Sequence, residues 1–257
     1  MIPSVAALHN SPAFDALDAT EKGWINYLLG MLFTKLAAAK MLDMPWLLHF
    51  KWFQALYPTT SLPGGSTPDF VGFNPLTQQF NVLEAKGRSS GYSNTVIDAA
   101  KAQAAQAVTL NGQPAHMHIG ALLYREYGER LAMAMADPEP EGPPREIADT
   151  RETWAQYYRV PLGLVRSTKS ERRDLQDQFG FTVDLDEKAR PLIEQFFESE
   201  VSDWRSARDA LLEWSANREK HSDTEVAETD SRTFGDGIKI GFSPDWRDAF
   251  VPDRRPE

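Results

Sequence analysis

The chain of 257 residues contains no cysteine. This absence excludes disulfide bonds, zinc sites built on thiolates and a cysteine nucleophile. Long apolar runs are missing as well. The longest, residues 28–39, is interrupted by Thr34 and Lys35 and falls short of the roughly 18 to 20 residues that a membrane-spanning helix needs. The N-terminus lacks the basic and apolar regions of a secretory signal. We therefore expect a cytoplasmic protein with no membrane partner.

The excess of negative charge lies in only one half of the chain. The formal net charge is −10, yet residues 1–136 hold nine acidic and nine basic side chains. Residues 137–257 hold 28 acidic and 18 basic side chains and so account for the whole excess. The acidic half is unsuited to lie along DNA, whereas the neutral half is able to form a local basic groove.

A stretch rich in proline and acid, DPEPEGPPRE at residues 137–146, coincides with this change in charge. We therefore predict a core domain over residues 1–136 and an acidic, mainly helical extension over residues 137–257. Within the extension the sequence favours helices near 147–160, 169–179 and 187–219, a flexible acidic linker near 221–232, and a short strand at GIKIGF.

The first half alternates helical and strand patterns. A helix is expected from Asp18, with Glu21 completing a capping box, to about Pro45, and one broad face of it is apolar. Residues 46–57 fit either a strand or a short helix. The segments that follow are two strands, DFVGF and QFNVLEAK, a helix over 95–110 capped by Asn94, and strands over 115–124 and 130–136. This order predicts an α/β (α+β) fold with a mixed sheet flanked by helices.

Charged residues stand at one end of the predicted hairpin. Glu84 and Lys86 are two apart on a strand, so their side chains point to the same face, and Asp69 lies on the neighbouring strand opposite them. Carboxylate oxygens at this spacing suit Mg²⁺ or Mn²⁺, with the Ala85 carbonyl, waters and a substrate phosphate completing the coordination. A lysine beside such an ion would orient or deprotonate an attacking water.

The sequence Pro68-Asp69, fourteen further residues, and then Glu84-Ala85-Lys86 resembles the motif of the PD-(D/E)XK nuclease superfamily, which includes restriction endonucleases and RecB-type nucleases. The order of elements over residues 18–136 is similar to the core of that superfamily. The resemblance implies a restriction-endonuclease-like fold and Mg²⁺-dependent hydrolysis of DNA. It also implies that Asp69, Glu84 and the Ala85 carbonyl hold the metal, with Lys86 at the water.

RecB-like members often add a glutamine from the next helix, and Gln103 and Gln106 both lie there, three apart on one predicted face. We favour Gln103. Further candidates are Glu21, which alternatively only caps its helix, and Arg88 and Lys101, which would contact phosphate or simply face solvent.

The resulting hypothesis is a metal-dependent DNA nuclease acting in phage defence, restriction, recombination or repair. The alternative is a catalytically silent subunit with the nuclease fold that binds nucleic acid or a partner protein. A third hypothesis is an interaction module whose acidic half is the functional part. In each case the C-terminal half is the candidate surface for a homodimer or a protein partner.

Overall fold

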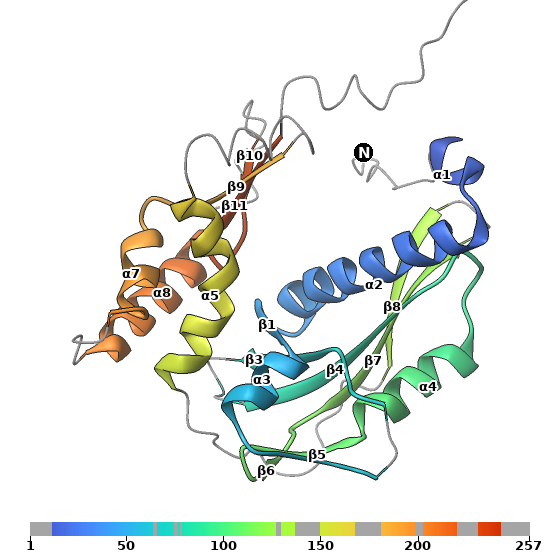
Figure 1. Cartoon of the computed structure of the whole chain (residues 1–257), viewed down its shortest axis with the longest axis horizontal. Helices are drawn as coiled ribbons and strands as arrows, with labels where there is room; N and C mark the ends of the chain where they lie inside the picture. Colours follow the sequence, from blue (N-terminus) through green and yellow to red (C-terminus); the bar gives the residue numbers. More distant parts are fainter. Residues whose placement is uncertain are drawn as a thin grey trace, which may run out of the picture. The chain divides into compact units, whose positions relative to one another are not determined.

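The computed structural model describes residues 12–63, 66–74, 77, 79–126, 130–136, 150–167, 181–198, 203–219 and 231–242. The chain divides into two compact units, Met1–Asp149 and Thr150–Glu257, and each is considered by itself (Figure 1). The proline-rich stretch at 137–146, the expected helix at 169–179 and most of the expected linker at 221–232 lie outside the described residues. Among the helices that are described, none is long and apolar enough to cross a membrane.

A five-stranded mixed sheet forms the centre of the first unit. Its strands lie in the order β1 (Trp46–His49), β3 (Phe70–Asn74), β4 (Gln79–Gly87), β7 (His118–Glu126) and β8 (Arg130–Ala136). The central pair, β4 and β7, is parallel, and every other neighbouring pair is antiparallel. The predicted hairpin of DFVGF and QFNVLEAK is therefore confirmed as β3 and β4, and the mixed sheet flanked by helices is confirmed with it.

Helices α2 (Ala19–Met41) and α4 (Asn94–Ala104) cover opposite faces of this sheet, and a short helix, α1 (Pro12–Ala16), precedes them (Figure 1). On the α2 side, Leu83 of β4 and Ile119 of β7 belong to a buried apolar cluster with Ala38 of α2. On the α4 side, Gly120 of β7 lies beside Glu84. A Cβ added to Gly120 would stand 2.6 Å from the backbone nitrogen of Lys101 in α4, so the helix lies directly on this strand. The two central strands are thus covered on both faces, as parallel strands usually are.

Helix α2 approaches the sheet at backbone distance. A Cβ added to Gly87 would lie 1.8 Å from the carbonyl oxygen of Asn26, and one added to Gly30 would lie 3.0 Å from the Gly87 nitrogen. Because Gly87 has no side chain, the backbone of α2 can lie directly against the backbone of β4 at this position. The helix begins as predicted, because the Asp18 carboxylate accepts from the Thr20 and Glu21 nitrogens and the Glu21 side chain accepts from the Asp18 nitrogen.

Three local expectations differ from the structure. Residues 46–57 contain both a strand, β1, and a helix, α3 (Phe50–Leu56). The helix expected over 95–110 ends at Ala104, and Ala107–Leu110 instead forms β5 in a small antiparallel sheet with β2 (Thr59–Ser61) and β6 (Gln113–Pro114). Val108 and Thr109 are β-branched and favour a strand over a helix. The cap of α4 is Ser93, whose hydroxyl accepts from the Val96 nitrogen, rather than Asn94.

The second unit combines helices with a sheet that the sequence revealed only in part. Helices α5 (Arg151–Arg166), α7 (Arg190–Gln195) and α8 (Trp204–Glu219) accompany a three-stranded antiparallel sheet in the order β10 (Ser231–Thr233), β11 (Ile238–Phe242) and β9 (Phe181–Leu185). The strand expected at GIKIGF is confirmed as β11. Buried Asp236, between β10 and β11, accepts from the Tyr157 hydroxyl through its carboxylate and from the Tyr158 hydroxyl, at 2.6 Å, through its carbonyl.

Candidate active site

Asp69 directly precedes β3, at the point where β4 continues beyond its pairing with β3. The last pair between these strands is Phe70 with Leu83, so Asp69 lies beside Glu84 and Ala85. Three hydrogen bonds fix it. Its carbonyl accepts from the Phe50 nitrogen at 2.8 Å, its own N–H donates to Glu84 Oε2 at 3.1 Å, and its Oδ2 accepts from the Ala85 nitrogen at 2.9 Å.

The backbone N–H and carbonyl of Ala85 point toward the side of β4 on which Asp69 lies. Val82 donates its N–H to the carbonyl of Met117, just before β7, and Arg88 donates to the carbonyl of Leu123 in β7. Backbone groups alternate sides along a strand, and the N–H and C=O of one residue point the same way. Because Ala85 is an odd number of residues from both, its N–H and carbonyl point away from β7, toward Asp69. The expected carbonyl ligand thus faces the expected carboxylate.

Glu84 is a buried acid at the centre of the site, with 2 % of its side chain exposed. Besides the Asp69 N–H, it accepts a hydrogen bond from Lys86 Nζ at 2.5 Å on Oε1. Burial raises the pKa of Glu84 to about 7, the hydrogen bond from Lys86 opposes that rise, and the charge of Asp69 adds to it. A carboxyl group with this pKa changes protonation state near neutrality, which is common at catalytic sites.

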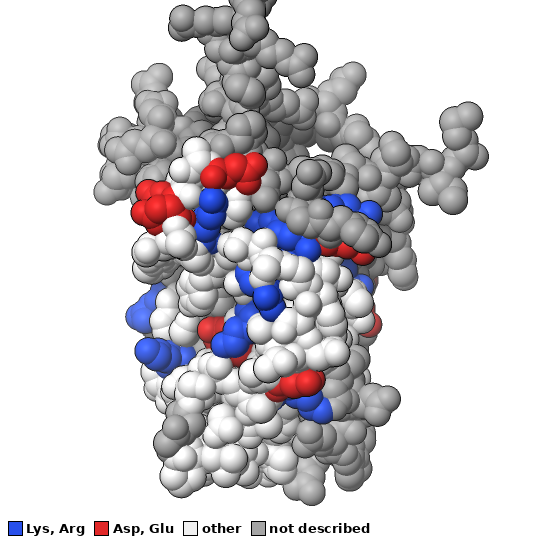
Figure 2. Space-filling model, turned by 90° about the vertical axis from the view of Figure 1, so that its right-hand side faces the viewer, with Lys and Arg blue, Asp and Glu red and all other residues white. Residues whose placement is uncertain are grey.

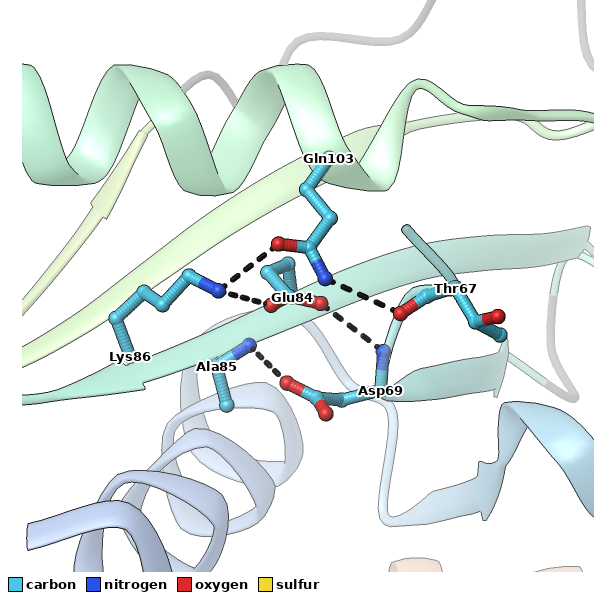
Figure 3. Close-up of polar contacts among 6 residues, drawn as sticks. All are labelled: Thr67, Asp69, Glu84, Ala85, Lys86 and Gln103. Atoms are coloured by element: carbon cyan, nitrogen blue, oxygen red, sulfur yellow. Dashed lines mark hydrogen bonds and ion pairs between the residues drawn. The ribbon is translucent and has the colours of Figure 1, made fainter. Parts of the chain in front are cut away.

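Lys86 is held between two acceptors from different elements. Its ammonium donates to Glu84 Oε1 and, at 2.9 Å, to Gln103 Oε1 of α4 (Figure 3). The other end of the Gln103 amide donates to the Thr67 carbonyl at 3.1 Å, so α4 is tied to the segment that carries Asp69. The Lys86 side chain is 34 % exposed, so its ammonium is within reach of a molecule from solvent.

Two further candidates lie outside this network. Gln106 falls beyond the end of α4, and its side-chain amide donates back to the Ala102 carbonyl at 3.2 Å. Gln103 is thus the glutamine whose side chain contacts Lys86, whereas the Gln106 side chain contacts the backbone of α4. The Glu21 carboxylate accepts from the Asp18 nitrogen at 3.0 Å, which gives it a capping role at the start of α2.

The two basic candidates also point elsewhere. The Arg88 Nε donates to the Ser90 hydroxyl at 2.6 Å, within the loop after β4. Lys101 lies two positions before Gln103 on α4, which is about 200° around the helix axis. Because Gln103 faces the network, Lys101 lies on a different side of the helix.

One member of the site and one residue near it left no signal in the sequence. The Thr67 carbonyl anchors Gln103, and a backbone acceptor leaves no signal in side-chain chemistry. Tyr27 of α2 stands close enough to be influenced by the site. Its pKa is raised by partial burial, then by the charges of Asp69 and Glu84, while Lys86 acts in the opposite direction. In the sequence Tyr27 appeared only as part of an apolar helical face.

The donor set fits a hard divalent cation. The carboxylates of Asp69 and Glu84 and the carbonyl of Ala85 are oxygen ligands of the kind that Mg²⁺ and Mn²⁺ take. Within the described ranges, no group of three or more histidine and acidic side chains could hold a metal. A cation here would therefore keep several waters or take substrate oxygens, which is the usual state of protein-bound Mg²⁺.

Comparison with protein-family models, with curated proteins and with solved structures finds no match to this chain. A function for this chain is therefore inferred from the residues of the site and their geometry.

Proposed function

We propose that the protein is a metal-dependent nuclease that hydrolyses DNA phosphodiester bonds and has a restriction-endonuclease-like core. The observation that carries the proposal is the hydrogen-bonded network of Asp69, Glu84, Lys86 and Gln103 at one end of β3 and β4. These are the residues that the resemblance to PD-(D/E)XK nucleases implies. The network combines two acids, an amine and an amide in one partly buried position.

Asp69, Glu84 and the Ala85 carbonyl would hold Mg²⁺ or Mn²⁺. When bound, such an ion neutralises phosphate charge and lowers the pKa of a coordinated water. Glu84 must be ionised to act as a ligand. Because its pKa is about 7 in the metal-free protein, a proton competes with the metal ion for this carboxylate near neutral pH. Metal affinity should therefore increase as the pH rises through 7.

Lys86 is the residue best suited to act on the substrate. Its ammonium is directed by Glu84 and Gln103, and its partial exposure permits contact with a phosphate oxygen or with the attacking water. Water attacks phosphorus in line, the bond to the 3′ oxygen breaks, and the products carry a 5′-phosphate and a 3′-hydroxyl. Gln103 has a positioning role, because it holds Lys86 at one end and the Thr67 carbonyl at the other.

The charge distribution is compatible with nucleic acid as the partner. The first half of the chain is neutral although the whole chain carries −10. Figure 2 shows lysine and arginine side chains gathered over the middle of one face, among uncharged surface and scattered acids. Such a surface attracts a phosphate backbone locally without a large net positive charge.

The test is cleavage of supercoiled plasmid and of single- and double-stranded oligonucleotides, with Mg²⁺ or Mn²⁺ and with EDTA. The wild-type protein should cleave only with metal, and Lys86→Ala should lower the rate by at least about 100-fold. Glu84→Gln should show no cleavage, with or without added metal. The matched controls are exposed residues of the same unit, Lys51→Ala and Asp98→Asn, and both should retain the wild-type rate.

Equal cleavage by all variants would contradict the assignment of these residues. A wild-type protein that binds these DNAs but cuts none of them with either metal would favour the alternative of a silent nucleic-acid-binding subunit.

A further inference from the structure

Helix α2 exposes several of its large apolar side chains on the side away from the sheet. The residues that it buries are small or polar and repeat every four positions: Asn26, Gly30, Thr34 and Ala38. The opposite side carries Trp24, Leu28 and Leu32, whose exposed fractions are 65 %, 57 % and 50 %. Trp24 lies two positions before Asn26, about 200° around the axis, so it points outward. A contiguous apolar surface of this kind is typical of a binding surface.

Tyr27 connects this surface to the candidate active site. It follows Asn26, whose carbonyl touches Gly87, and precedes Gly30, which packs on the backbone of Lys86 and Gly87. Tyr27 therefore belongs to the turn of α2 that lies against the end of β4, where Lys86 and Gly87 stand. Its position about 100° from Asn26 puts it on the flank of the helix, between the buried side and the outward side. The effect of Asp69 and Glu84 on its pKa agrees with this placement.

Trp24 and Tyr27 form a single aromatic surface. Their ring centroids are 6.3 Å apart with an interplanar angle of 90°, and Tyr27 is 44 % exposed. In an edge-to-face pair one ring covers a face of the other, and the exposure of both side chains leaves the remaining faces within reach of a third aromatic group. Lys22, two positions before Trp24, is the lysine of α2 nearest to this pair in the chain, and its ammonium donates to the Asp15 carbonyl at 2.9 Å. Exposed aromatic rings of this kind form platforms on which the bases of single-stranded nucleic acid stack.

We propose that Trp24 and Tyr27 stack against unpaired bases of a strand that enters the active site, so that the preferred substrate is single-stranded or frayed DNA. This inference rests on the proposed nuclease function. Bases inside an intact duplex stack on one another and present only their edges, so they offer no face to these rings. The base nearest the scissile phosphate would meet Tyr27, and the next base outward would meet Trp24.

The experiment measures the affinity of the full chain for a fluorescently labelled 20-nucleotide oligo(dT) by anisotropy, in EDTA so that no cleavage occurs. Trp24→Ala and Tyr27→Ala should each weaken binding roughly 5- to 100-fold, the effect of losing one base-stacking contact. Tyr27→Phe should bind like wild type, because the ring and not the hydroxyl makes the contact. Trp52→Ala, which removes a tryptophan that is 42 % exposed on α3, is the matched control and should have no effect.

Unchanged affinity in both alanine variants would overturn the proposal. If Trp24→Ala instead converts a dimer to a monomer in sedimentation while oligonucleotide binding is unaffected, the apolar surface joins two copies of the chain and the proposal is wrong. The failure of the nuclease function would look different. In that case oligo(dT) binding would depend on both rings, but no DNA would be cleaved with Mg²⁺ or Mn²⁺.

Discussion

The buried carboxyl group of Glu84 makes a quantitative prediction about stability and pH. Its pKa rises from 4.5 to about 7 on folding, because burial disfavours the charged form more strongly than Lys86 supports it. Between these two values the folded protein holds a proton that the unfolded chain releases. The stabilising contribution is therefore complete below pH 4.5 and is lost as the pH rises through 7.

The size of the effect follows from the shift. At about 1.4 kcal/mol per pKa unit, the rise corresponds to about 3 kcal/mol. Relaxation of the site and entry of water around the ionised carboxylate reduce the cost of its burial, and we expect about 2 kcal/mol. Glu84→Gln removes the ionisation while keeping an oxygen that accepts from Lys86. The variant should match wild type at pH 5 within about 0.5 kcal/mol and exceed it by about 2 kcal/mol at pH 8.

The assay is thermal unfolding in EDTA at several pH values from 5 to 8. For a chain of this size the gain at pH 8 corresponds to about 4–8 °C in Tm. Asp98→Asn, an exposed acid-to-amide change on α4, is the control and should follow the wild-type curve. A parallel loss of stability in Glu84→Gln and wild type as the pH rises, or a variant that is less stable than wild type at pH 8, would refute this prediction.

Three other predictions concern packing and positioning. Gly30→Ala should destabilise the fold by about 1–3 kcal/mol, since its Cβ would stand 3.0 Å from backbone atoms of β4. Gly23→Ala in the same helix meets open space and should be neutral or stabilising in urea unfolding, and equal losses in both would refute the close approach. Tyr157→Phe removes a hydrogen bond to a buried aspartate and should lower the stability of the second unit by about 1–3 kcal/mol, which unchanged unfolding would contradict. Gln103→Ala should slow DNA cleavage by at least about tenfold, because Lys86 loses a hydrogen-bond partner. Gln106→Ala is the control and should leave the rate unchanged. Equal rates in the two variants would argue against a positioning role for Gln103.

The parts of the site that the sequence predicted depend on local rules. Strand periodicity is enough to put Glu84 and Lys86 on one face, and a hairpin is enough to bring Asp69 opposite them. The start of α2 could be predicted from the sequence for the same reason, because the capping box joins Asp18 and Glu21, which are only three residues apart. Each of these inferences needs only neighbours in the chain or a single turn.

The parts that the sequence did not predict depend on distant partners. Helix α2 was expected to have one broad apolar face, yet the surface against the sheet consists of Asn26, Gly30, Thr34 and Ala38. Small residues are selected there because the helix approaches the backbone of β4 so closely, a fact visible only when both elements are in place. The end of α4 at Ala104 likewise depends on the pairing of β5 with β2, which joins residues about fifty positions apart.

Strand β9 was missed for the same reason. It pairs with β11 across more than fifty residues, and its partner is the terminal strand that the sequence did reveal. A five-residue strand has too little periodicity of its own to be recognised without that partner.

The most direct test of the central claim is an anomalous diffraction map from a crystal soaked with Mn²⁺ at pH 8, where Glu84 is ionised. We expect a peak within about 2.5 Å of carboxylate oxygens of both Asp69 and Glu84 and of the Ala85 carbonyl, and we expect no such peak in crystals of Asp69→Asn. A saturating soak that leaves this position empty, or a peak bound by other residues while DNA is still cleaved, would contradict this claim.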